Sequence, residues 1–342
     1  MSAISKISNS DTFIKHLNTE GLEKAEVELT RVYGERYTRY RQEWKHAGEL
    51  AYEPPFPLYI MMEQTYRCNL RCPSCVHGYP DLRKPLSFRE SCMPRALWDK
   101  VVLEGEKNGC PSISVHNNDE PLLVKDLADR IAFAKAHGFM DIIMTTNGTL
   151  FTEEKIRAVI DAGVTRILFS IDAATEEVYD KVRAGGDYNK VICALKQALA
   201  YRKEIGSTLP IIRVSFVPTI YNQHQLVEFV KQYKNLVDYI DVQPYCGWKG
   251  VNAGVKPLNA APIQNFRCNG PWRAVIVRGN GDVLPCPNFY GAELVLGNLH
   301  DNNLESIFNS KRTRELRREF KEGVYSHAGC HDCSENIFEL NL

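Results

Sequence analysis

Three closely spaced cysteines are the residues of this 342-residue sequence with the clearest chemical meaning. Cys68, Cys72 and Cys75 lie in the segment TYRCNLRCPSCVHG, with CxxxCxxC spacing. Iron-sulfur clusters are held by cysteine thiolates, usually four. A 4Fe-4S cube bound by only three thiolates keeps one iron open to an outside ligand. The triplet therefore predicts a reactive 4Fe-4S site.

Two other interpretations of this triplet are weaker. Spacings of four and three also place residues on one helix face, where cysteines are small buried apolar side chains. Pro73, inside the triplet, argues against a helix. A structural zinc site needs four protein ligands, usually in CxxC pairs. An iron-sulfur cluster remains the favoured interpretation.

A second group of cysteines lies in the last quarter of the sequence. Its members are Cys268, Cys286, Cys330 and Cys333. Four thiolates suffice to ligate every iron of a cluster, but a structural zinc ion accepts the same four ligands. Local chemistry therefore allows either an iron-sulfur cluster or a zinc ion at this second site.

The elements that must position the first triplet are alternating apolar runs and amphipathic stretches from residue 58 onward. Six strands are predicted, at 58–65, 113–116, 141–146, 166–171, 211–217 and 239–243. Repeated βα units form parallel sheets, which either close into a full or partial barrel or spread into an open sheet. Both bind ligands at the carboxyl ends of the strands, where the triplet lies.

The flanking segments differ from this repeating region. Residues 1–56 are polar and helix-prone, and end at a proline cluster, which predicts a helical N-terminal leader. Residues 247–265 have the composition of a linker. A hairpin is predicted over 274–284, turning at 279–281, and a basic helix follows it.

Composition narrows the classes of partner. Lys plus Arg and Asp plus Glu both number 42, so net charge gives no sign of a nucleic-acid or membrane surface. No apolar run reaches the roughly 20 residues of a membrane helix, and the N-terminus lacks a secretion signal. A cytoplasmic protein is expected. In a reducing cytosol its 11 cysteines favour metal ligation over disulfides.

The triplet, in a loop after the first strand, resembles that of the radical S-adenosylmethionine superfamily, and the resemblance covers nearly all of the chain after residue 57. It implies a partial (β/α)6 barrel over residues 57–250. It also implies that S-adenosylmethionine binds the open iron, and that one electron cleaves it to a deoxyadenosyl radical that abstracts hydrogen from a substrate. In such enzymes the cofactor carries the hard chemistry and the protein supplies position.

Two further segments resemble cofactor contacts of that family. HNNDEPLL resembles its GGEP segment, so that Glu120 is expected to receive the cofactor's ammonium group and Asn118 to lie beside it. The glycines are replaced by Asn118 and Asp119. TTNG makes Asn147 a polar contact by the same resemblance. Without the resemblance, Glu120 is a loop acid or helix N-terminal charge, and Asn147 a turn residue.

The segment FSIDAAT and the arginine downstream of it resemble the family's SIDGAT region. The resemblance implies that Ser170 binds the ribose or carboxylate of the cofactor and Arg183 its carboxylate. An arginine fork fits a carboxylate geometrically. Asp172 is a further candidate contact, or instead the cap of the next helix.

The second cysteine group, with the helix IFNSKRTRELR between its halves, resembles the SPASM/twitch extension of the superfamily. The resemblance implies an auxiliary 4Fe-4S cluster with all four sites filled, in a small α+β module over residues 251–342. Only nine residues follow Cys333, which fits the shorter, twitch type with one cluster. The basic residues of the helix either dock a flavodoxin or ferredoxin as electron donor or form a solvated face; they are Lys311, Arg312, Arg314, Arg317, Arg318 and Lys321.

Relatives with one auxiliary cluster and no recognition domain act on sugars and aminocyclitols, as dehydrogenases or epimerases. A polar small-molecule substrate is therefore expected. Cys246, just past the sixth strand, is placed to return a hydrogen atom to the substrate in an epimerase, although a lone cysteine is also often inert. Peptide or protein modification is the second candidate class, and a non-enzymatic electron carrier the third.

Overall fold

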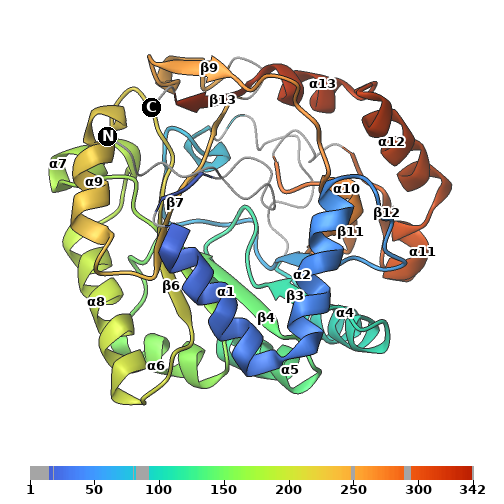
Figure 1. Cartoon of the computed structure of the whole chain (residues 1–342), viewed down its shortest axis with the longest axis horizontal. Helices are drawn as coiled ribbons and strands as arrows, with labels where there is room; N and C mark the ends of the chain where they lie inside the picture. Colours follow the sequence, from blue (N-terminus) through green and yellow to red (C-terminus); the bar gives the residue numbers. More distant parts are fainter. Residues whose placement is uncertain are drawn as a thin grey trace.

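A mostly parallel sheet forms the centre of the computed structural model, with helices around it (Figure 1). The structure describes residues 15–17, 19–79, 81, 92–247, 251–288 and 294–340. Six parallel strands lie side by side in chain order, which confirms the α/β, partial (β/α)6 barrel prediction. They are β2 (Tyr59–Glu63), β3 (Ser112–Ser114), β4 (Asp141–Thr146), β5 (Arg166–Ser170), β6 (Ile211–Phe216) and β7 (Tyr239–Val242).

Helices follow these strands and cover the sheet from outside (Figure 1). They are α4 (Arg95–Lys107), α5 (Leu127–Ala136), α6 (Glu153–Asp161), α7 (Glu176–Val182), α8 (Tyr188–Glu204) and α9 (Leu226–Tyr233), with short 3-10 turns η1 (Val76–Gly78), η2 (Pro121–Leu123) and η3 (Gln223–Gln225). Thr152 caps the N-terminus of α6, because its hydroxyl accepts the Lys155 N–H at 3.4 Å.

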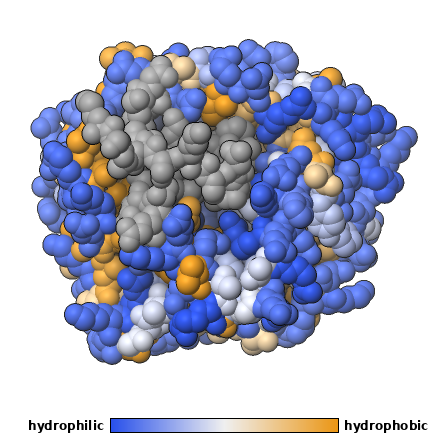
Figure 2. All heavy atoms as spheres, in the orientation of Figure 1, coloured by the Kyte–Doolittle hydropathy of each residue, from blue (hydrophilic) through white to orange (hydrophobic). Residues whose placement is uncertain are grey.

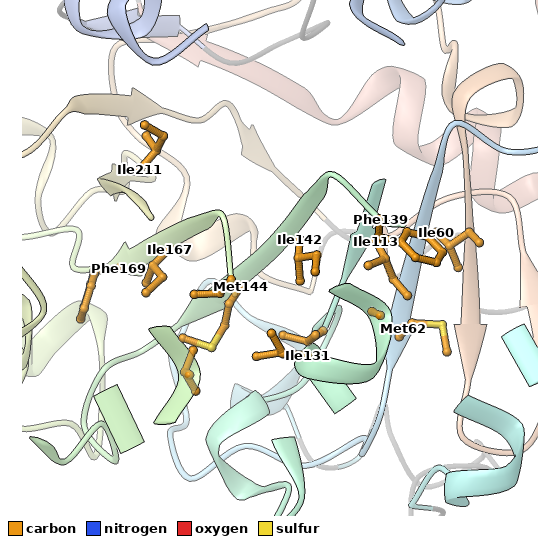
Figure 3. Close-up of a cluster of buried hydrophobic side chains, with 14 of the residues drawn as sticks. Ile60, Met62, Ile113, Ile131, Phe139, Ile142, Met144, Ile167, Phe169 and Ile211 are labelled. Carbon is orange, nitrogen blue, oxygen red and sulfur yellow. The ribbon is translucent and has the colours of Figure 1, made fainter. Parts of the chain in front are cut away.

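The core lies between the sheet and these helices. Figure 3 shows Ile113 of β3, Ile142 of β4 and Ile167 of β5 among its buried side chains, with Ile131 of α5 beside them. All four are fully buried. Strands that are covered on both faces are rich in apolar residues, which explains why apolar runs indicate the approximate positions of these strands.

The barrel is open, because β2 and β7 pair with other strands on their outer edges. β1 (Lys15–Leu17) lies antiparallel to β7. On the other edge, β10 (Ala274–Arg278) lies parallel to β2, with Ala274 opposite Tyr59 and Arg278 opposite Glu63. β10 turns into β11 (Asp282–Leu284), which confirms the predicted hairpin. The addition of this hairpin to the barrel sheet was not predicted.

The remaining C-terminal elements flank the open side. A second sheet has the order β8-β13-β9 and places Ile337 of β13 opposite Cys246 of β8. The elements are β8 (Tyr245–Cys246), η4 (Ala253–Val255), β9 (Ala260–Pro262), α10 (Gly270–Arg273), β12 (Gly297–Asn298), α11 (Leu304–Phe308), α12 (Lys311–Glu322), α13 (Ala328–Glu335) and β13 (Ile337–Leu340).

Two N-terminal helices, α1 (Thr19–Tyr33) and α2 (Glu35–Gly48), cover the amino ends of the strands. Arg166 at the start of β5 pairs with Glu26 of α1 at 3.1 Å and with Asp141 at the start of β4 at 2.8 Å. It also donates a hydrogen bond to Tyr37 of α2. The helices expected in the leader are therefore present, and they close the end opposite to the predicted ligand site.

The surface seen in Figure 2 is mainly hydrophilic, with apolar side chains scattered between polar ones. Within the described ranges, no helix has both the length and the apolar character needed to span a membrane.

Candidate functional site

The first cysteine group lies in an irregular loop after β2. Residues 68–75 are not helical, so the helix-stripe interpretation is wrong. The loop folds tightly, because a Cβ on Gly78 would lie 2.4 Å from the carbonyl oxygen of Cys72. The Arg71 N–H donates to Ala184 O at 2.8 Å, which ties the loop to the segment after α7. Only glycine fits where the chain turns back on the Cys72 carbonyl.

The three thiols of this group lie close enough to affect one another. Burial raises the pKa of Cys68 to about 11, and the charges of Glu120 and Cys72 add to the shift. Burial raises the pKa of Cys75 to about 12, and both other cysteines contribute. Protonated thiols at neutral pH become thiolates when a metal replaces the protons. Three converging sulfurs fit a cubic iron-sulfur cluster held at three corners.

Glu120 follows β3 and is buried against this loop. Its backbone N–H donates to Arg67 O at 2.9 Å. Its carboxylate accepts three hydrogen bonds, from the Thr146 hydroxyl at 2.7 Å, the Asn147 N–H at 2.8 Å and the Leu122 N–H at 3.2 Å. Burial raises the pKa of this carboxyl. A carboxylate has about four lone-pair positions, which leaves one for an ammonium group.

Asn147 lies directly against the first cysteine group. Its side-chain amide donates to Asn69 Oδ1 at 2.9 Å and lies 3.7 Å from Cys68 Sγ. Its oxygen accepts the Thr149 N–H at 3.0 Å, which is the contact of a turn asparagine. The structure thus supplies the turn role, and a contact with the cofactor stays a prediction.

Arg183 lies between an acid and a sulfur. Its NH2 group pairs with Asp172 Oδ2, and its NH1 group lies 3.9 Å from Cys72 Sγ. Among the described residues its Nε and the nearby Tyr179 hydroxyl are buried without a hydrogen-bond partner. Buried polar groups normally have hydrogen-bond partners, so the Arg183 Nε and the Tyr179 hydroxyl are available to bind a polar ligand.

Asp172 supports Arg183 instead of capping α7. Thr175 precedes the first residue of α7, and Asp172 adopts a positive φ of 61° and accepts the Val217 N–H at 2.8 Å. The helix-cap alternative for Asp172 is therefore wrong. Ser170 ends β5, half-buried and opposite Ser215 of β6, on the same edge of the sheet.

Two other acids lie beside this site, and the sequence motifs did not identify either of them as a functional residue. Glu63 ends β2, is buried, and pairs with Arg278 of β10 at 3.3 Å. Asp119 accepts the N–H groups of Gln64 and Thr65, each at 3.1 Å. Glu63 is an acid at the end of a largely apolar strand, and this pattern could have marked it as a site residue from sequence. Its partner Arg278 could not be identified in this way, because their contact depends on the pairing of β2 with β10. Asp119, in place of a family glycine, ties two loops together.

The second group contains five cysteines instead of four. Burial raises the pKa of Cys286, and the charges of Cys268, Cys330 and Cys246 add to the shift. A hydrogen bond with Cys246, together with burial, raises the pKa of Cys333. Cys246 therefore lies at the second cysteine group, a position that its place in the sequence did not reveal.

Asn118 connects the two groups. Its side-chain amide donates to Pro287 O at 3.2 Å, next to Cys286. Its own carbonyl oxygen lies 2.6 Å from His77 Nε2, two residues after Cys75. The side-chain amide of Asn118 thus joins the two cysteine-bearing loops, and its expected contact with the cofactor stays a prediction.

The basic helix α12 has one side buried. Arg317 was expected to share its basic face, but it is 2% exposed, stacks on Phe308 at 4.2 Å and donates to Pro271 O at 3.0 Å. The expectation that Arg317 lies on a solvated or docking face is therefore wrong. The other basic residues of the helix are exposed: Lys311, Arg312, Arg314, Arg318 and Lys321.

Two domain families match this chain. The model of the radical SAM superfamily matches residues 62–216, and that of the SPASM iron-sulfur cluster-binding domain matches residues 268–334. Together they span well over half of the chain. The chain belongs to the radical SAM superfamily and carries a SPASM/twitch-type module. Its cofactors are accordingly S-adenosylmethionine and 4Fe-4S clusters.

Individual relatives agree with this assignment. The tungsten-containing aldehyde ferredoxin oxidoreductase cofactor-modifying protein of Pyrococcus furiosus is 26% identical over 325 residues, covering 81% of this chain and 87% of that protein. GTP 3',8-cyclase of Limosilactobacillus fermentum is 28% identical over 179 residues, covering 52% of this chain and 51% of that enzyme.

Two solved structures have a similar fold. The structure of BtrN in complex with AdoMet and 2-DOIA has a TM-score of 0.57 and 20% identity, covering 82% of this chain and 93% of that one. That of SuiB from Streptococcus suis bound to S-adenosylmethionine has a TM-score of 0.58 and 15% identity, covering 87% and 78%.

Proposed function

We propose that this enzyme abstracts hydrogen from a polar small molecule of the sugar or aminocyclitol type, giving dehydrogenation or epimerisation. When bound, the cluster of the first group supplies the electron that cleaves S-adenosylmethionine to the 5'-deoxyadenosyl radical. We assign that cluster to Cys68, Cys72 and Cys75, and the auxiliary cluster to the second cysteine group. The protein's own task is to position the reactants and exclude water.

Three side chains are proposed to hold S-adenosylmethionine. Glu120 has one lone-pair position left for its ammonium group. Arg183 faces its carboxylate with a buried Nε that has no partner among the described residues, and Asp172 fixes the guanidinium. Ser170, on the same edge of the sheet, is proposed to contact the ribose or carboxylate.

The contact between Asn118 and Pro287 is the observation that carries the choice of reaction. It joins the segment of Glu120 to the loop of Cys286. A substrate radical formed near the first group would therefore lie near an electron acceptor at the second, which favours dehydrogenation. The proposed electron donor of the first cluster is an acidic flavodoxin or ferredoxin, docking on the exposed basic residues of α12.

Epimerisation is the second outcome, with Cys246 as the proposed hydrogen donor. It is supported by the half-buried position of Cys246 on β8, just after the last barrel strand. Returning a hydrogen atom would leave a sulfur radical, which one electron and one proton would restore to the thiol.

Modification of a peptide or protein is the alternative substrate class. It is supported by the SuiB structure bound to precursor peptide SuiA, which has a TM-score of 0.56 with this chain. For a small molecule, the corresponding support is the BtrN complex with AdoMet and 2-DOIA. A non-enzymatic electron carrier is the third candidate, and the pocket of Glu120 and Arg183 argues against it, because electron transfer needs no such pocket.

Anaerobic reconstitution with iron, sulfide, dithionite and S-adenosylmethionine tests the proposal. Deoxyadenosine release that rises with a panel of sugars and aminocyclitols, but not with peptides, is expected. Deuterium in the recovered product after reaction in heavy water would select epimerisation over dehydrogenation. Release that responds only to peptides would overturn the small-molecule proposal.

A further inference from the structure

The second cysteine group has one sulfur more than a four-iron cluster needs. β8 pairs with β13, the strand that follows α13. This pairing brings Cys246 of β8 close to Cys333 of α13. The other members arrive from the loop before α10 (Cys268), the end of the hairpin (Cys286) and α13 (Cys330). Five sulfurs from four segments therefore converge on one place.

Asn288 shows how two of these sulfurs are arranged. Its side-chain amide donates to Cys246 Sγ at 2.9 Å and lies 3.5 Å from Cys333 Sγ. Its backbone N–H donates to Cys286 Sγ at 3.2 Å. Cys246 and Cys333 also hydrogen-bond to each other. One amide thus holds these two sulfurs on the same side of the group.

Cys330 lies three residues before Cys333 on α13, and among the described contacts its sulfur makes none with the Asn288 amide. Cys330 neighbours Cys268 and Cys286, because the charge of Cys268 raises the pKa of Cys330 and the charge of Cys330 raises the pKa of Cys286. Two sets of four sulfurs can therefore be formed around one cluster. Both contain Cys268, Cys286 and Cys330, and they differ in whether Cys333 or Cys246 is the fourth member.

We propose that Cys246 and Cys333 share one corner of the auxiliary cluster, with Cys246 as the substitute ligand for the iron at that corner. Each cluster iron takes one cysteine thiolate from the protein. Two sulfurs held by one amide are placed to serve the same iron, not two irons of the cube. This inference goes beyond the proposed reaction and holds for any substrate.

The test uses the full chain with Cys68, Cys72 and Cys75 all changed to alanine, so that only the auxiliary cluster is counted. In this background Cys333→Ala should keep about four irons per chain after anaerobic reconstitution, because Cys246 takes over. Adding Cys246→Ala should lower iron and sulfide well below that level. The electron paramagnetic resonance spectrum of the reduced cluster should shift in Cys333→Ala, since the ligand has changed.

Two variants serve as controls. Cys330→Ala should lose iron even though Cys246 is present, because the Asn288 amide holds Cys246 beside Cys333 and not beside Cys330. Cys193→Ala, which removes an exposed cysteine of α8, should change nothing. Where an alanine variant lacks the circular dichroism of the folded chain, the serine variant at the same position replaces it.

The same series contains the results that would overturn the proposal. Equal iron content in Cys333→Ala and in the Cys246→Ala/Cys333→Ala variant would show that Cys246 does not bind the cluster. Loss of iron both in Cys333→Ala and in Cys246→Ala made alone in the same background would show that the two sulfurs serve different irons. Neither result depends on cleavage of S-adenosylmethionine, so failure here is distinguishable from failure of the proposed function.

Discussion

At the residue scale, the first cysteine group is surrounded by side chains that support one another. Arg183 touches Cys72 and is held by Asp172, whose positive φ aims its carboxylate back toward the arginine. The resemblance to family motifs predicts Asp172 and Arg183 as two separate cofactor contacts. Their ion pair joins the two sides of α7 and could not be predicted from sequence, because it depends on how that helix packs.

His116, two residues after β3, gives a prediction about stability. Its ring Nδ1 accepts the Thr145 N–H at 3.0 Å, and burial lowers its pKa to about 3, well below the ordinary 6.5. The folded state therefore keeps this ring neutral while the unfolded state binds a proton below pH 6.5. The free energy of unfolding should fall by about 1 to 2 kcal/mol from pH 7.5 to pH 5 on this account.

Urea unfolding of the wild type and of His116→Gln at both pH values measures this contribution. Glutamine can accept the same hydrogen bond but does not titrate, so the variant should lose less stability on acidification. An identical pH dependence of the two proteins would show that His116 has no part in it.

At the scale of elements, the barrel strands were predictable and the added hairpin was not. Buried apolar side chains such as Ile113, Ile142 and Ile167 mark the strands, because strands covered on both faces are rich in apolar residues. β10 is equally buried, but its neighbour is β2, more than 200 residues earlier in the chain. The sequence predicts the hairpin, but no local pattern in it identifies β2 as the strand that pairs with the hairpin's other edge.

The buried ion pair between Glu63 and Arg278 gives a prediction about this join. Both side chains are almost fully buried, and they lie opposite each other in the β2–β10 register. Arg278→Met leaves the Glu63 carboxylate without its cation, which should cost about 3 to 5 kcal/mol. Thermal unfolding of Arg278→Met and of Glu63→Gln/Arg278→Met measures the effect. The double variant should recover much of the loss, and a double variant no more stable than Arg278→Met would contradict this explanation.

Asn118 gives a prediction about the connection between loops. Asn118→Ala removes the hydrogen bond to Pro287 and leaves the backbone contact with His77. Product formation should fall about tenfold, which corresponds to about 1.4 kcal/mol, while iron content stays at the wild-type level. Asn302→Ala, at an exposed asparagine, is the matched control. Unchanged turnover in Asn118→Ala would show that the connection does not matter for the reaction.

At the scale of the whole molecule, one sheet carries both cysteine groups. β2 leads into the first group, and β10 and β11, on the edge beside it, lead into the second. The spacing of the cysteines predicted two groups. It did not predict that Cys246 lies at the second group, because the position of Cys246 depends on the pairing of β8 with β13. The contact between the two groups through Asn118 and Pro287 required the shared sheet, which no local pattern encodes.

The most direct test of this account removes one of the three thiolates proposed to hold the first cluster. Cys72→Ala, reconstituted anaerobically beside the wild type, should release no deoxyadenosine from S-adenosylmethionine and should bind about four irons per chain where the wild type binds about eight. Deoxyadenosine release by Cys72→Ala at the wild-type rate would contradict the assignment of the radical chemistry to Cys68, Cys72 and Cys75.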